Sequence, residues 1–526
     1  MDLLIENARI WTGDVAAPWA EAALVREGVF AFVGRRGDTK PPAGAERIDA
    51  GGRLMLPGFV DGHAHLYGTG MALASVGLRD TKDEADAARR VHERVLGGAA
   101  GAWVYGAGWD QNDWPDARFP TRASLDAIAP ETPVLLTHVS AHCVWANSAA
   151  LRAAGVTRET PDPAGGSIDR DADGEPTGVL RDNAMELVQR ASPPASAEQR
   201  RAYLRSAIAH AHGLGVTAVH AMDVGRGEWA ALQALHADGE LSLRVRAFLS
   251  ARRLDAWIAE GARSGDGDEM LRIGGVKFFA DGALGSMTAW MREPYEGTHD
   301  TGIALQTAEE LGERVERSLR AGLAPAIHAI GDRANSEVLD TLERLREVAR
   351  ELPRRIEHAQ LLNARDVPRF AALGVTASVQ PVHATQDMRV ADRAWGKRCA
   401  TAYAYRSLVE SGANVAFGSD TPVETMDPIA GIHAAVTRRA ADGEPAGGWH
   451  PEQRVSLDAA IAAYTRGCAA AVGEEPRAGR IARGQQADFV LLSDDLFTLE
   501  DPMRMLDVRV EVTAVGGRVV FGHLEV

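Results

Sequence analysis

The sequence of 526 residues predicts an α/β protein: a (β/α)8 TIM-like barrel with a composite β-sandwich domain and a lid insertion. Three observations predict this architecture. Short apolar runs alternate with alanine-rich helical stretches, which is typical of parallel βαβ units. Both chain ends carry short strands and turns, but each is too small to bury a core alone. A long turn-rich segment follows the first barrel strand.

Short strands and polar breaks occupy the two ends of the chain. We expect residues 1–56 and 478–526 to pair as the two parts of one β-sandwich, because neither part suffices alone. The barrel then spans residues 57–477. Two further strand candidates, 103–109 and 134–139, fall in the insertion, which we place at about residues 78–196.

Eight strand candidates in the barrel region share a short β-branched or apolar run. They are residues 59–65, 216–223, 243–249, 276–281, 324–329, 355–360, 375–381 and 415–420. Eight parallel strands with intervening helices close into a barrel whose strand ends converge on one face. Residues that are distant in sequence can therefore share one site.

The composition excludes several classes of protein. Lysine and arginine total 57 against 73 aspartates and glutamates, so the formal charge of −16 argues against a partner that is nucleic acid or anionic membrane. The three cysteines, Cys143, Cys399 and Cys468, are too far apart for a disulfide scaffold or thiolate zinc cluster. No secretion signal or apolar run of about 20 residues is visible. We expect a soluble, cytoplasmic protein.

The segment Gly58–His65 carries the strongest chemical signal. Alternate residues of a strand share a face, so His63 and His65 can both point into one site. Neutral imidazoles suit zinc. A second His-x-His pair, His210 and His212, lies in a helical stretch where residues two apart diverge, so we interpret it as structural or as part of the surface.

Further polar residues lie on or at the ends of later barrel strands. They are Lys277, His328, His358 and Asp420. Singly, Lys277 could be a salt-bridge partner, His358 a core histidine and Asp420 a helix N-cap. A separate explanation of this kind is needed for each residue, whereas convergence at one face of the barrel accounts for all four residues together.

These residues resemble the metal site of the amidohydrolase superfamily. The surrounding motifs resemble its YtcJ-like branch, which includes N-substituted formamide deformylases; they are GVKFFADG (275–282), IHAIGDRA (327–334), RIEHAQ (355–360) and GSDTPV (418–423). The resemblance implies that His63, His65 and Asp420 hold one metal ion and that His328 and His358 hold a second. Lys277 would be carboxylated and would bridge the two; without carboxylation, a single zinc ion is expected.

The resemblance also implies the reaction. We expect a metal-dependent hydrolase of a non-peptide C–N bond, an amide or N-substituted formamide, that acts on a small molecule. Metal binding lowers the pKa of water towards about 7, and Asp420 would accept the proton and pass it to the leaving nitrogen. Tryptophans in the insertion favour an apolar or aromatic substrate group.

Five further residues are predicted to bind substrate. Trp109 and His142 lie in the insertion, which we expect to cover the barrel mouth, and Asp281, Gln380 and His383 lie at or after strand ends. Glu357 should point away from the site, because it precedes His358 on a strand.

Two other functions remain open. A deaminase or cyclic-amide hydrolase would use the same metal set, because barrel loops rather than the fold select the reaction. A catalytically silent regulatory or binding protein would be marked by a lost ligand, and none is missing here. A homodimer is compatible with the sequence.

Overall fold

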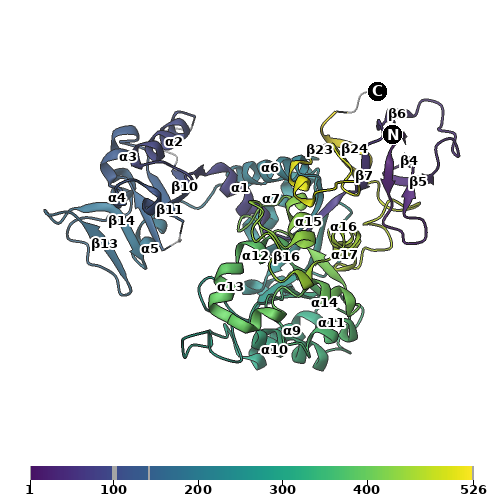
Figure 1. Ribbon diagram of the computed structural model, residues 1–526. Coiled ribbons are helices and arrows are strands. Elements are labelled where there is room, and N and C mark those ends of the chain that lie inside the picture. Colours follow the sequence, from purple (N-terminus) through teal and green to yellow (C-terminus); the bar gives the residue numbers. More distant parts are fainter. Residues whose placement is uncertain (1, 98–102, 140–141, 524–526) are drawn as a thin grey trace. The chain divides into compact units, whose positions relative to one another are not determined.

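A computed structural model describes residues 2–97, 103–139 and 142–523 of the chain (Figure 1). The chain forms two compact units. One combines Met1–Gly68 with Ala207–Val526, and the other is Thr69–Ser206.

Eight parallel strands form the barrel of the first unit and confirm the predicted fold class. In order they are β8 (Phe59–Ala64), β15 (Val216–Val224), β16 (Arg244–Ser250), β17 (Leu271–Phe279), β18 (Pro325–Ala329), β19 (Arg354–His358), β20 (Val375–Val379) and β21 (Val415–Phe417). The first and last strands meet just beyond β21, where Asp420 N donates to His63 O at 2.7 Å and His65 N donates to Thr421 O at 2.9 Å. The barrel therefore closes at the predicted site.

Helices follow the barrel strands as the alternating pattern predicts. They include α1 (Leu66–Ala74), α7 (Arg226–Ala237), α8 (Leu254–Ala259), α9 (Ala308–Arg320), α10 (Asp332–Arg344), α11 (Val367–Leu373), α12 (Pro381–Gln386), α13 (Met388–Trp395), α14 (Tyr405–Glu410), α15 (Pro428–Thr437), α16 (Leu457–Ala463) and α17 (Arg466–Ala470). Helix α9 illustrates the local sequence features that form such a helix. Thr307 and Glu310 form a capping box, and Leu311, Val315 and Leu319 bury one stripe at helical spacing.

Two sheets at the chain ends form the composite β domain, which is also as predicted. One has the order β5 (Val29–Gly34), β4 (Ala22–Arg26), β1 (Leu3–Glu6), β6 (Glu46–Asp49); the other is β24 (Arg518–Phe521), β23 (Val510–Val515), β22 (Phe489–Leu492), β7 (Leu54–Pro57), β2 (Arg9–Trp11), β3 (Trp19–Ala20). Purple and yellow strands lie side by side in Figure 1, because β7 pairs with β22. Ile5, Ile10, Phe30, Phe489 and Val512 share one core.

The second unit, Thr69–Ser206, is built on its own six-stranded sheet. The strand order is β13 (Gly166–Arg170), β14 (Pro176–Asp182), β12 (Cys143–Ala146), β11 (Val134–His138), β10 (Val104–Trp109), β9 (Val76–Gly77). Its helices include α2 (Glu84–Leu96), α3 (Arg122–Ile128), α4 (Ser148–Ala153) and α5 (Met185–Gln189), and α6 (Ala197–Gly213) leads back to the barrel. Residues 78–196, where we place the insertion, lie within this unit.

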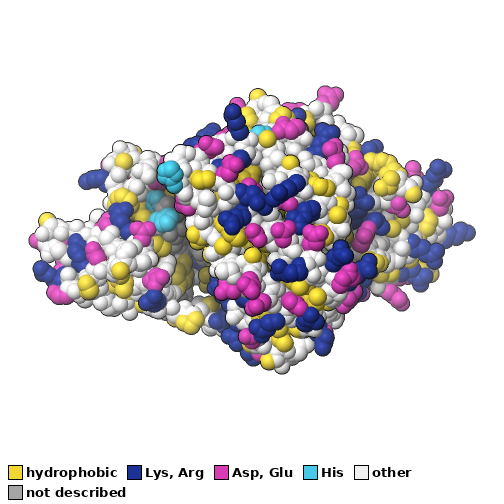
Figure 2. Space-filling model, turned by 90° about the horizontal axis from the view of Figure 1, so that it is seen from below, with side chains coloured by type: hydrophobic (Ala, Val, Ile, Leu, Met, Phe, Trp, Pro, Cys, Tyr) yellow, Lys and Arg dark blue, Asp and Glu magenta, His cyan; other side chains and the backbone are white. Residues whose placement is uncertain are grey.

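Charged side chains of both signs are interspersed over the face shown in Figure 2. This distribution fits a solvated surface rather than a single-sign binding patch on that face. Among the described residues, no helix combines the length and apolar character that a membrane crossing requires.

Candidate metal centre

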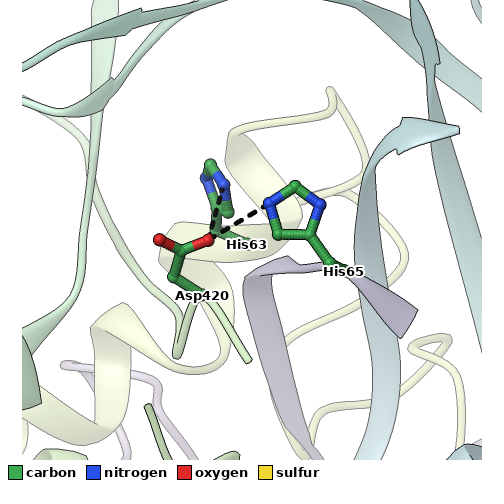
Figure 3. A group of neighbouring side chains, drawn as sticks. All are labelled: His63, His65 and Asp420. Carbon is green, nitrogen blue, oxygen red and sulfur yellow. Dashed lines mark ion pairs between the residues drawn. The ribbon is translucent and has the colours of Figure 1, made fainter. Parts of the chain in front are cut away.

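Asp420 lies at the centre of a group of imidazoles at the barrel's closing seam. Its Oδ1 is 3.4 Å from His63 Nε2 and 3.3 Å from His65 Nε2 (Figure 3). Strand β8 carries His63 inward, and His65 follows directly after its end. Asp420 follows β21 with φ at +60°, a backbone conformation that L-residues rarely adopt and that concentrates at functional sites.

A second donor group shares the same carboxylate. The ligand atoms of His358, His383 and Asp420 all lie within 4.8 Å of one another, as do those of His63, His65 and Asp420. His383, predicted to bind substrate, places Nε2 3.8 Å from Asp420 Oδ2. The geometry therefore puts His383 among the possible metal ligands.

Glu357 orients His63 by a hydrogen bond to the ring nitrogen that faces away from Asp420. The Nδ1–H of His63 donates to Glu357 Oε2 at 2.6 Å, and burial lowers the pKa of His63 to about 4. A neutral imidazole with its proton on Nδ1 keeps its lone pair on Nε2, which faces Asp420. Although burial raises the pKa of Glu357, the guanidinium of Arg355 holds it well below its usual range, so Glu357 stays ionised. The expectation that Glu357 points away from the site is wrong.

Gln380 has the corresponding position behind His358. The Nδ1–H of His358 donates to Gln380 Oε1 at 2.8 Å, which leaves Nε2 of His358 as the nitrogen with a lone pair. The side chain of Gln380 is buried and engaged with this imidazole, and its predicted contact with substrate stays a prediction.

Asp61 forms hydrogen bonds that link strand β8 to the segment after β21, where the barrel closes. Its Oδ1 accepts the backbone N–H groups of His63 and Ser419, and its Oδ2 accepts the Ser419 hydroxyl. Burial raises the pKa of Asp61 to about 6. These bonds hold His63 and the segment that precedes Asp420 in one geometry.

His328 lies beside His358 but outside both donor groups. The two ring centroids are 4.6 Å apart, and the Nε2–H of His328 donates to Gly282 O at 2.9 Å. Asp281, predicted to bind substrate, is buried and accepts backbone N–H groups from Trp290, Ile330 and Gly331. Its carboxylate therefore holds the loops after β17 and β18.

Lys277 is fully buried in the barrel unit. Its Nζ has no hydrogen-bond partner among the described residues, and burial lowers its pKa to about 8. A lysine with this pKa is partly neutral near physiological pH, which is the state needed for carboxylation.

Trp109 and His142 both lie in the unit Thr69–Ser206. The indole of Trp109 is fully buried against Trp114 and Trp145, and its Nε1–H donates to Leu136 O. This packing leaves the indole no exposed surface for a substrate. His142 is exposed, with Nδ1 3.1 Å from Asp182 Oδ1. That this unit covers the barrel mouth stays a prediction.

Replacing Trp109 with phenylalanine should reduce stability and leave KM unchanged. The variant loses the bond to Leu136 O and leaves a small cavity, at a cost of about 1–2 kcal/mol. Urea unfolding and steady-state kinetics measure the two effects. A several-fold rise in KM with an unchanged unfolding midpoint would instead show that the indole contacts substrate.

The comparisons with known proteins identify the class of protein. The model of the amidohydrolase family matches residues 46–521, so the chain belongs to this family.

Particular relatives refine the resemblance. YtcJ of Bacillus subtilis (strain 168) is 34% identical over 513 residues, which cover 95% of this chain and 96% of YtcJ. The N-substituted formamide deformylase of Arthrobacter pascens is 30% identical, with 94% of each chain covered. A solved metal-dependent hydrolase from Pyrococcus horikoshii OT3, whose own function is uncharacterised, superposes with a TM-score of 0.81 at 29% identity and covers 95% of this chain and 99% of its own. The predicted relationship to the YtcJ-like branch is confirmed.

Proposed function

We propose that this protein hydrolyses a non-peptide C–N bond, in an amide or N-substituted formamide, with a metal ion held around Asp420. The main support is that the buried carboxylate of Asp420 belongs to two groups of imidazole donors at the carboxyl end of the barrel. The similarity to an N-substituted formamide deformylase over 94% of the chain favours this reaction within the family.

The residues present fit a metal ion. His63 Nε2 and His383 Nε2 are buried and make no hydrogen bond within the described part of the chain, which is costly unless a ligand satisfies them. Imidazole nitrogens with one carboxylate are a typical zinc donor set. His63, His65 and Asp420 would hold one ion. A second would take His358 with His383, or with His328 and a carboxylated Lys277.

A bound zinc ion would supply a water of lowered pKa and polarise the substrate carbonyl. The chain supplies the proton transfers. Burial raises the pKa of Asp420, but the neighbouring imidazoles, His63 first and then the hydrogen bond from His65, hold it well below its usual range. The carboxylate is therefore ionised at neutral pH and can accept a proton, then deliver it to the departing nitrogen.

Removal of the metal with dipicolinate should abolish turnover, and added zinc should restore it.

We expect N-phenethylformamide to release formate and amine, whereas hydantoin and cytosine, which test cyclic-amide hydrolysis and deamination, should not react. Zinc analysis and mass spectrometry of the intact chain give the stoichiometry and the state of Lys277. Ammonia release from cytosine would favour a deaminase, and a protein that binds no zinc and stays inactive would favour a silent binding protein.

A further inference from the structure

A cavity of about 300 Å³ adjoins Lys277 within the barrel unit. The lining residues that matter here are Asp223, Arg252, Lys277, Phe279, Leu305 and Arg314. Asp223 and Arg252 lie at the carboxyl ends of β15 and β16, the two barrel strands that supply no proposed metal ligand. The cavity therefore lies beside Lys277, at the carboxyl ends of strands that supply no proposed metal ligand.

Neither guanidinium group of this cavity, Arg252 or Arg314, forms an ion pair with another residue in the described part of the chain. Arg314 is half-buried and is held by neutral acceptors, Gln306 Oε1 at 2.9 Å and Ala251 O at 2.7 Å. Arg252, on the turn η2 (Ala251–Arg253), has no hydrogen bond or ion pair among the described residues. Leaving Lys277 aside, two positive charges face the single carboxylate of Asp223, so the cavity favours an anion.

Asp223 adds an acceptor of defined position. Its backbone has φ at +54°, as Asp420 has +60°, and its Oδ1 is buried without a hydrogen-bond partner among the described residues. Such an oxygen is satisfied by an N–H donor from a ligand. Phe279 and Leu305, the latter 53% exposed, add apolar surface to the same cavity.

We propose that this cavity binds the N-substituent of the substrate and that this substituent carries a carboxylate, as in an N-acyl amino acid with an apolar side chain. The inference rests on the proposed function. Arginine recognises carboxylates through paired N–H donors, and Asp223 Oδ1 would accept the amide N–H next to that carboxylate. Hydrolysis breaks the C–N bond, and water gives its hydroxyl to the acyl carbon and a proton to nitrogen, which yields a carboxylic acid and the free amino acid.

The test compares substrates that differ only in the carboxylate. With zinc-loaded enzyme, kcat/KM for one enantiomer of N-formylphenylalanine should exceed that for N-phenethylformamide by about 10-fold, the effect of one charge-assisted contact. Arg252→Gln should lower the first value about 10-fold and bring the ratio of the two values close to one. Arg253→Gln is the matched control: it removes the same charge from the same turn but does not line the cavity.

Binding gives a readout that is independent of turnover. Calorimetry with 3-phenylpropionate and its primary amide should show tighter binding of the acid, and only Arg252→Gln should remove the difference. The inference is overturned if kcat/KM is the same for the two formamides. It is also overturned if Arg253→Gln loses as much affinity for 3-phenylpropionate as Arg252→Gln does. In both cases, turnover of the formamides still supports the proposed function. If neither formamide is hydrolysed, the proposed function fails and the binding difference alone decides the inference.

Discussion

Asp420→Asn is expected to lower kcat at least about 10³-fold, because an amide of the same shape cannot accept the proton that Asp420 delivers to the leaving nitrogen. Much of the metal should remain bound, since the imidazoles that surround this position are unchanged. Steady-state kinetics and zinc content, measured on the same preparation, separate the two effects.

Asp427→Asn is the matched control for this variant. Asp427 caps α15, its side chain accepts Ile429 N–H, and asparagine caps helices as well as aspartate does. Its kcat should stay close to that of the unmodified enzyme. Near-normal turnover in Asp420→Asn would contradict the assignment of Asp420 as general acid–base. Complete loss of zinc from this variant would show that the main role of Asp420 is to bind the metal.

Glu357→Gln is expected to weaken zinc binding about 10- to 100-fold, the usual effect of losing a carboxylate behind a metal-binding histidine. The same change should cost about 3 kcal/mol of stability, because it leaves the buried guanidinium of Arg355 without its anion. Zinc titration and the urea midpoint measure the two losses.

The double variant Arg355→Met/Glu357→Gln tests this explanation. Removing both charges should recover part of the stability, since no unpaired ion remains, but it should not recover zinc affinity. Glu410→Gln breaks an exposed pair with Arg406 and should leave the urea midpoint unchanged. If the single variant binds zinc normally, Glu357 has no orienting role for His63.

Local patterns were sufficient for most of the fold. Short apolar runs between helical stretches predicted all eight barrel strands, because a strand buried on both faces needs only a short run of suitable residues. Polar residues at strand ends predicted His63 and Asp420, since parallel strands bring those ends together. These inferences depend on chain order and strand direction, and both are visible in the sequence.

The partners of these residues were decided by tertiary structure. Strict alternation predicts that Glu357 and His358 point to opposite faces, but His358 has φ at +73° and leaves the extended conformation, so both side chains reach the site. The position of His383 depends on how α12 packs after β20, and the burial of Trp109 depends on two other tryptophans.

The sequence by itself therefore determined the barrel, the composite β domain and the residues that gather at the carboxyl ends of the strands. Only the tertiary structure decided that Glu357 lies behind His63, that Gln380 lies behind His358, and that a cavity lined by two arginines opens beside Lys277. The physical reason is that hydrogen bonds and cavities depend on side-chain directions within a few ångströms, and those directions are set by packing between segments far apart in the chain.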